Sequence, residues 1–412
     1  MNKEVFFNLP KKVVFCKACV MSNQRPSSVQ EFKHVKERKG AIYLNINEEG
    51  VCDACLQNEI KNNLINWEDR EEELLKILEK HRKNDGSYDC LVPGSGGKDS
   101  VYQAHVLKYK YGMHPLLTTW SPILYTDYGY ENYKNWIEIG GFDNVTFKPN
   151  GKAMKTLTRL SIENLLHPFQ TFILGQKNLA PKIASQYGID LVFYGENEAE
   201  YGNPLADNAK SLRDKSYFTY KNINDIFLGG LPIKQILEEH DLSLADLTTF
   251  LPLAADEFDK TNIQIHYLGY YLRWIPQEAY YYAVEHTNFQ ARPYRSQGTY
   301  SKYNSIDDKI DDLHYYTTFI KYGLGRATYD ASQEIRNNHL TRKEAQALVK
   351  KFDGEFPDRY FNEIMDYLSI EPERFHEICN EYRSPHLWKK ANKDWSLRHT
   401  VNFDGTDDKV KS

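Results

Sequence analysis

One short segment constrains this chain more than any other feature of its 412 residues. Residues 93–100 read Pro-Gly-Ser-Gly-Gly-Lys-Asp-Ser, directly after a short apolar run and directly before an amphipathic stretch. Glycines let the backbone curl so that successive N–H groups point at one anion, and a helix N-terminus adds about half a positive charge. The segment therefore predicts a phosphate-binding loop between a strand and a helix. The alternative is a Gly-rich turn that only joins the two elements.

The spacing excludes a Walker A loop, which would need a glycine where Val92 stands and Ser or Thr where Asp99 stands. The segment instead resembles the PP-loop of N-type ATP pyrophosphatases, which release pyrophosphate while a nucleophile attacks the α phosphorus to give an adenylate. This resemblance implies ATP as cofactor. The residues that it implies for ATP binding are Ser95, Gly96, Gly97, Lys98, Asp99 and Ser100, the last three also with catalytic roles.

Alternating periodicity places this loop in an α/β domain. Apolar runs at 88–93, 116–120, 145–147 and 190–194 predict strands, and the stretches at 99–111, 132–140 and 153–187 predict helices between them. This order is typical of a doubly wound, mostly parallel sheet, here of the PP-loop type. Residues 233–253 predict one or two further helices, and 263–274 a further strand.

The chain divides into four expected regions. These are a zinc-binding module with four cysteines at 1–66, the PP-loop ATP pyrophosphatase domain at 67–300, a helical substrate-side region at 301–398 and a loose tail at 399–412. In the third region, Ser305 followed by Asp308 has the arrangement of a capping box and predicts a helix start.

A second polar motif ends the predicted strand at 190–194. Gly195-Glu196-Asn197 stands at the carboxyl end of that strand, where open α/β sheets bind ligands. Glu196, together with Asp99, is a candidate ligand for Mg²⁺ on the phosphates, and Gly195 a candidate contact for the nucleotide. A plain turn is the alternative. The resemblance alone implies that the backbone of the strand that ends at Trp120 binds the adenine base.

Four of the six cysteines form two Cys-x-x-Cys pairs, Cys16 with Cys19 and Cys52 with Cys55. Two such pairs complete a closed tetrahedral site with no open position for chemistry, which predicts structural zinc. Two disulfides or a redox pair are the alternatives. Cys90 and Cys379 fall inside a predicted strand and a helical stretch, and we expect both to be small core residues.

A basic loop at 292–303 contains Arg292, Arg295 and Lys302 among hydroxyls and tyrosines, and Arg326 follows the next helical stretch. Arginine and lysine in such a loop suit a phosphorylated or carboxylated ligand, so these four cations and Asn197 are candidate substrate residues. The alternative is a solvated basic loop.

Charge and hydropathy exclude other classes of protein. The net charge is −5, with +6 concentrated in residues 1–39 and −11 in the remainder, so no chain-wide field favours nucleic acid or anionic membranes. No apolar run has the length of a signal peptide core or of a membrane span. We therefore expect a cytoplasmic protein without a membrane partner, whose overall charge does not favour nucleic acid, while local charged patches stay open as binding surfaces.

Taken together, these motifs resemble the N-acetyl sugar amidotransferases of bacterial surface-glycan and nonulosonic acid biosynthesis. The residues that carry the resemblance are Cys16, Cys19, Arg25-Pro26, Cys52, Cys55, Ser95–Ser100, Gly195-Glu196-Asn197, Tyr300–Tyr303, Asp307–Lys309 and Gly325–Thr328. The resemblance implies that the acetamido group of a sugar becomes an acetamidino group at the expense of ATP, with Mg²⁺ and Zn²⁺ as further cofactors and ammonia derived from glutamine.

The chain has no cysteine at its start or on a nucleophile elbow that would make it a glutaminase. A separate glutaminase subunit is therefore expected. The resemblance implies one similar to the glutaminase of imidazole glycerol phosphate synthase, together with its barrel partner. The alternative function is a tRNA-thiolating PP-loop enzyme, a class that also combines adenylation with Cys-x-x-Cys modules. A non-catalytic zinc adaptor would leave residues 95–100 unexplained.

Overall fold

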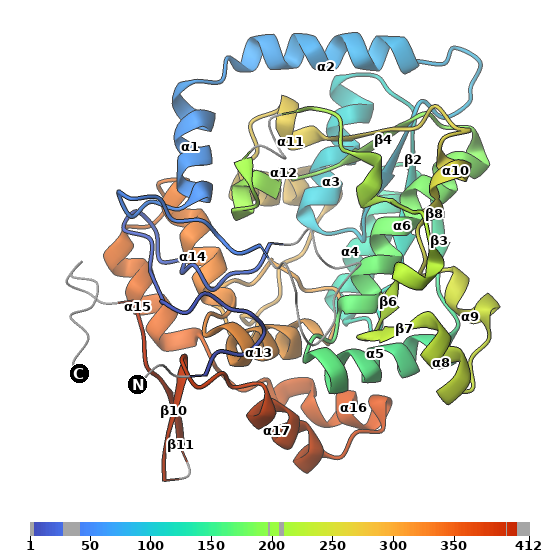
Figure 1. The fold of residues 1–412 in the computed structure, drawn as a ribbon. Coiled ribbons are helices and arrows are strands. Elements are labelled where there is room, and N and C mark those ends of the chain that lie inside the picture. Colours follow the sequence, from blue (N-terminus) through green and yellow to red (C-terminus); the bar gives the residue numbers. More distant parts are fainter. Residues whose placement is uncertain (1–3, 28–41, 197, 206–209, 393, 402–412) are drawn as a thin grey trace.

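A five-stranded sheet lies at the centre of the molecule, with the strands in the order β3-β2-β1-β4-β9 and all neighbours parallel (Figure 1). The structure, a computed structural model, describes residues 4–27, 42–196, 198–205, 210–392 and 394–401. The strands are β1 (Cys90–Pro93), β2 (Pro115–Trp120), β3 (Asp143–Phe147), β4 (Leu191–Tyr194) and β9 (Gln264–Tyr267). Because all strands point the same way, their carboxyl ends and the loops after them meet at one edge.

Helices cover both faces of the sheet, because alternate residues of each buried strand point to opposite sides. Val92 packs with the helices of one face and Leu91 with those of the other. The first face carries α2 (Trp67–His81), α3 (Lys98–His105), α4 (Asp127–Glu138) and α12 (Pro276–Thr287). The second carries α5 (Gly151–Leu165) and α6 (Gln170–Tyr187). The predicted doubly wound parallel α/β fold is confirmed.

Two less regular stretches follow the sequence pattern in part. Residues 233–253 contain α8 (Ile233–Glu239) and α9 (Leu244–Thr248), and Ser243 and Asp246 form a capping box at the start of α9. The predicted strand at 263–274 is shorter, because β9 ends at Tyr267 and α11 (Leu268–Tyr271) follows.

The predicted helix at 99–111 consists of α3 and a π-helical turn, Val106–Lys110. Short elements between β4 and β9 are η3 (Glu198–Tyr201), η4 (Lys215–Tyr217), β5 (Thr219–Tyr220), η5 (Ile223–Asp225), β6 (Phe227–Leu228), β7 (Leu231–Pro232), β8 (Leu253–Ala254) and α10 (Ala255–Phe258).

The C-terminal region is helical, as expected. Its elements are α13 (Asp311–Tyr322), α14 (Arg326–Arg336), α15 (Arg342–Phe352), α16 (Asp358–Leu368), α17 (Pro372–Glu381), β10 (Trp388–Ala391) and β11 (Asp394–Leu397). The final strands form an antiparallel hairpin. Among the described residues, no helix combines the length and the apolar character that crossing a membrane would need.

The N-terminal module packs against these C-terminal helices and shares one apolar core with them (Figure 1). The ring of Phe7 stacks on that of Tyr382 with centroids 5.0 Å apart, and the backbone N–H of Phe6 donates to Ser384 Oγ at 3.0 Å. The chain then leaves the module through α1 (Asp53–Asn63) and α2 towards the sheet. The two ends of the chain therefore build one structural unit.

Asp308 ties the C-terminal region to the carboxyl edge of the sheet. Its buried carboxylate accepts hydrogen bonds from the backbone N–H groups of Ile123 at 2.6 Å and Leu124 at 3.3 Å, just after β2, and from Ile310 at 3.0 Å. A Cβ on Gly129 would approach the Asp307 Cα to 2.3 Å, so only glycine permits this contact. Segment 306–310 is thus fixed against the start of α4.

The capping box predicted at Ser305 and Asp308 is wrong. Ser305 has φ of 46° and α13 begins only at Asp311, so Ser305 does not start a helix. The physical reason is tertiary, because the Asp308 carboxylate binds backbone donors from the loop after β2.

Replacing Asp308 by alanine should lower the free energy of unfolding by about 2–4 kcal/mol, because it leaves buried backbone donors without an acceptor. Glu363→Ala is the control, since it removes only the partially exposed ion pair with Lys309 at 2.6 Å and should cost less than about 1 kcal/mol. Urea unfolding of both variants measures the difference. Equal losses would show that Asp308 is not a structural link.

Candidate active site

The glycine-rich loop lies between β1 and α3, as the sequence predicts. Gly97 caps α3 in an extended conformation, and the Ser100 hydroxyl donates to the Gly97 carbonyl at 2.9 Å. Gly96 has φ of 85°, and a Cβ there would meet the Tyr133 backbone at 2.6 Å. The first N–H groups of a helix have no intrahelical acceptor, so they are open to an anion here.

A cavity of about 270 Å³ opens above this loop; we call it the phosphate-loop cavity. It brings together segments that are far apart in the chain. Its lining includes Ser95, Gly96, Gly97, Lys98, Asp99, Gly129, Asn132, Glu196, Tyr201, Tyr303–Asp307, Arg326, Tyr329, Asp330 and Gln333. The sheet edge thus forms one wall, and α14 of the C-terminal region forms the opposite wall.

Two carboxylates and one ammonium group face each other at the base of this cavity. Lys98 Nζ pairs with Asp99 Oδ2, while Asp99 Oδ1 is buried with no hydrogen-bond partner among the described residues. Burial raises the pKa of Glu196 to about 7; the charge of Asp99 acts in the same direction, and Lys98 opposes it. Repelling carboxylates with an unused oxygen fit a divalent cation that takes oxygen ligands, so Asp99 and Glu196 would hold Mg²⁺.

The structure places the remaining predicted nucleotide residues next to this cavity or outside it. Gly195 lies at the end of β4 and lines an adjoining cavity of about 260 Å³, which shares Glu196 and Tyr201 with the first. The Trp120 side chain is buried in the core, stacked on Phe147 with centroids 5.4 Å apart. Asn197 lies outside the described residues.

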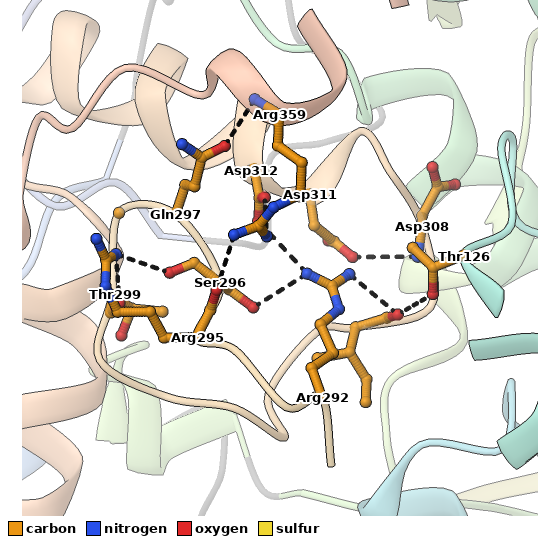
Figure 2. Close-up of polar contacts among 12 residues, drawn as sticks. Thr126, Arg292, Arg295, Ser296, Gln297, Thr299, Asp308, Asp311, Asp312 and Arg359 are labelled. Atoms are coloured by element: carbon orange, nitrogen blue, oxygen red, sulfur yellow. Dashed lines mark hydrogen bonds and ion pairs between the residues drawn. The ribbon is translucent and has the colours of Figure 1, made fainter. Parts of the chain in front are cut away.

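Of the four predicted substrate cations, Arg326 alone lines the phosphate-loop cavity, and it pairs with Asp330 at 2.8 Å. The others have partners within the fold, as Figure 2 shows for Arg292 and Arg295. Arg292 is buried and donates to the Ile306 carbonyl at 3.1 Å, Arg295 forms a bidentate pair with Glu355 at 2.5 and 2.6 Å, and Lys302 donates to the Pro293 carbonyl at 3.1 Å.

Sequence reasoning missed Tyr201, Asn132 and Tyr329 as lining residues. Tyr201 hydrogen-bonds Glu196 and follows it by five positions, so its nearness to the Gly195-Glu196 motif was a usable signal. Asn132 and Tyr329 reach the cavity only because α4 and α14 pack beside it, and a local sequence pattern does not predict such tertiary packing.

The four N-terminal cysteines converge on one point, and their sulfur atoms all lie within 4.8 Å of one another. Cys16 Sγ is 3.9 Å from Cys55 Sγ, and Cys19 Sγ is 3.7 Å from Cys52 Sγ. A regular tetrahedron with metal–sulfur bonds of about 2.3 Å has edges of about 3.8 Å, whereas a disulfide needs about 2.05 Å. The site therefore fits structural zinc, and all four cysteines are free of disulfides.

Arg342 fastens this metal centre to the C-terminal region. Its guanidinium donates to the carbonyl oxygens of Cys19 at 3.1 Å and Cys16 at 3.2 Å. All four cysteines are buried in the core that the module shares with α13, α16 and α17. Zinc here would therefore stabilise the contact between the two ends of the chain.

Cys16→Ser should remove zinc and lower the melting temperature, because three thiolates hold the ion less tightly and the shared core loses its anchor. The matched control is Cys379→Ser, which alters a buried core thiol far along the sequence and should keep one zinc per chain. Elemental analysis of protein purified without added metal measures this. Full zinc content in Cys16→Ser would contradict the assignment.

Known proteins resemble parts of this chain. Residues 297–402 match the family model described as "LPS biosynthesis protein WbpG-like, C-terminal domain". Over 73 residues the chain is 38% identical to "Uncharacterized protein MJ1599" of Methanocaldococcus jannaschii, a match that covers 17% of this chain and 26% of that protein. NMN synthetase from Francisella tularensis aligns with a TM-score of 0.24 and 14% identity, over 45% of this chain and 92% of that chain, and we conclude nothing from so low a score.

The matched region includes α14, the helix that closes the phosphate-loop cavity opposite the glycine-rich loop. The match of residues 297–402 to the WbpG-like C-terminal domain supports the resemblance to the N-acetyl sugar amidotransferases that the motifs carry.

Proposed function

We propose that this protein is an ATP-dependent amidotransferase that converts the acetamido group of an N-acetyl sugar into an acetamidino group, for lipopolysaccharide or flagellar glycan biosynthesis. One observation carries the proposal: the glycine-rich loop, Glu196 and α14 of the WbpG-like domain line a single cavity. The loop offers amides for the phosphates, and the domain named for lipopolysaccharide biosynthesis supplies the facing wall.

The chemistry needs an activated amide. Resonance of the nitrogen lone pair makes an amide carbonyl a poor electrophile, so ammonia cannot displace its oxygen directly. Attack of that oxygen on the α phosphorus of ATP forms an O–P bond and releases pyrophosphate. Ammonia then adds to the carbon of the imidate, the C–O bond breaks, AMP leaves with the oxygen, and a proton is lost to give the amidine.

The residues of the cavity suit these steps. The amides at the start of α3 and the Lys98 ammonium would stabilise charge on the departing pyrophosphate. Asp99 and Glu196 would hold Mg²⁺, which supplies positive charge to the phosphates. Tyr201 hydrogen-bonds Glu196 and orients it. Arg326, held by Asp330, faces the loop from the substrate side.

The source of ammonia is proposed to be a separate glutaminase subunit, with or without a barrel subunit. Cys90 and Cys379 are buried, and burial raises the pKa of both thiols, that of Cys379 to about 12. A buried thiol with a raised pKa is a poor nucleophile, which supports ammonia production elsewhere. We further propose that the protein acts in the cytoplasm.

A tRNA-thiolating enzyme is the second candidate, favoured by the net charge of +6 in residues 1–39. Such an enzyme would also form AMP and pyrophosphate, so the acceptor decides between the two. Stimulation of pyrophosphate release by tRNA, and none by acetamido sugars, would favour this second candidate.

Incubation with ATP, ammonium and an acetamido sugar should yield AMP, pyrophosphate and a product one dalton lighter than the sugar, because NH replaces O. Asp99→Asn should reduce turnover roughly a hundredfold or more, since it removes charge at the phosphate site. Asp256→Asn, an exposed position on α10, is the matched control and should retain activity. Chromatography and mass spectrometry measure the products. Formation of ADP and phosphate would contradict the proposal.

The purified single chain should make amidine from ammonium salts but not from glutamine. Free ammonia is a small fraction of ammonium at neutral pH, so its activity should rise steeply as the pH approaches the pKa of ammonium. Addition of the glutaminase subunit should restore the use of glutamine. Glutamine-dependent activity of the single chain would falsify the assignment of ammonia production to a partner.

A further inference from the structure

A second cavity of about 210 Å³ lies beyond Arg326 and Tyr329, which line both it and the phosphate-loop cavity. We call it the cationic cavity. Its other walls come from Arg25, Pro26 and Ser27 of the N-terminal module, from Leu166 and His167 after α5, and from His314–Tyr322 of α13. The N-terminal module, the sheet domain and the WbpG-like domain therefore all contribute to it.

Among the described residues, every formally charged side chain that lines the cationic cavity is a cation. Arg25, Lys321 and Arg326 line it, and no Asp or Glu is among the described residues that do so. Arg326 pairs with Asp330, and Lys321 donates to the Leu165 carbonyl at 2.6 Å. Both of these side chains thus already have oxygen partners.

Arg25 hydrogen-bonds the Tyr329 hydroxyl but leaves two of its nitrogen atoms unpaired within the described part of the chain. Its side chain is buried, and its Nε and Nη1 atoms have no hydrogen-bond partner among the described residues. Its guanidinium lies 5.7 Å from the centroid of the Tyr329 ring, and so beside the boundary between the two cavities. A buried charge without an anion costs several kcal/mol, so a fold that keeps one at a cavity wall is suited to an anionic ligand.

The cysteine cluster supplies countercharge mainly to another arginine, Arg336, and less to Arg25. Burial acts to lower the pKa of Arg336, but the charges of Cys19, Cys55 and Cys52 outweigh it and raise that pKa. Burial lowers the pKa of Arg25, and the opposing effects of Tyr329, Cys52 and Glu198 offset it only in part. An anion bound in the cavity would supply further countercharge to Arg25.

We propose that the cationic cavity binds an oxyanion, a carboxylate or a phosphate, carried by the same sugar whose acetamido group enters the phosphate-loop cavity. A guanidinium presents paired N–H donors that match either oxyanion. The shared wall of Arg326 and Tyr329 lets one sugar reach both cavities. The identity of the ligand as a sugar rests on the proposed function, whereas the anion site rests on Arg25 and the cavity.

Calorimetric titration of the full chain with three sugars tests this without ATP. The probes are neutral N-acetylglucosamine, its 1-phosphate and the corresponding uronate. We expect at least one anionic sugar to bind roughly tenfold or more tightly than the neutral sugar, because a charge-assisted hydrogen bond in a buried site has about that value. The preferred anionic sugar identifies the oxyanion. Equal affinity for all three would overturn the proposal.

Two kinds of variant locate the site: one removes a positive charge from the cavity, and the other adds a negative charge to it. Arg25→Gln should lose the preference for the anionic sugar, and Arg25→Lys should keep part of it. Thr318→Glu places a carboxylate inside the cavity, so it should also abolish anion binding while leaving the melting temperature equal or higher. Arg342→Gln is the control for docking of the module, because it lies outside the cavity and should keep the preference when zinc is retained.

An anion preference that persists in both Arg25→Gln and Thr318→Glu would place the binding elsewhere and overturn the proposal. The proposed function fails differently. If no acetamido sugar yields an amidine, but Arg25 still determines anion affinity, then the amidotransferase assignment is wrong and the anion site stands. If neutral and anionic sugars are converted equally well by both wild type and Arg25→Gln, then the anion site is wrong.

Discussion

The Asp308 carboxylate links two regions that would otherwise approach each other only at their surfaces. By accepting the N–H groups of Ile123 and Leu124, it fixes segment 306–310 against the loop that follows β2. The Thr126 hydroxyl donates to the Ile306 carbonyl beside it, and Gly129 permits backbone contact with Asp307. Because α13 begins directly after this segment, the position of α14 over the glycine-rich loop depends on the same link. A carboxylate buried among backbone donors is a more rigid connection than apolar contact alone, since hydrogen bonds are directional.

The sequence predicted those parts of the fold that are determined by interactions between residues close together in the chain. A buried strand, a glycine-rich turn and a helix start occupy consecutive residues, so β1, the loop at 94–97 and α3 follow from local periodicity and glycine chemistry. The pairing of Cys16-x-x-Cys19 with Cys52-x-x-Cys55 likewise indicated a shared metal centre, which the sulfur positions fit. Glu196 lies in the cavity because the carboxyl ends of parallel strands share one edge, a rule that needs only the strand order.

The parts that could not be predicted depend on tertiary contacts. Arg292 and Arg295 have the composition of a ligand-binding loop, yet their guanidinium groups bond to a carbonyl and to Glu355 within the fold. Arginine forms a stable pair wherever a carboxylate is brought near, and sequence does not reveal which carboxylate that will be. Ser305 shows the same limit, because a capping pattern is a local preference that the tertiary hydrogen bonds of Asp308 override.

The shared core of the N-terminal module and α13–α17 has a consequence for biosynthesis. Phe6 meets Ser384, 378 positions later, and most of the buried apolar residues in the core around the cysteine centre come from the last hundred residues of the described chain. A domain folds on the ribosome only when its partners in the core have emerged. The N-terminal module must therefore wait, with its thiols and aromatic rings exposed, until the helices α13, α16 and α17 have been synthesised. Early capture of zinc by the emerging thiols would shorten that exposure, so metal supply would influence the yield of folded protein as well as its stability.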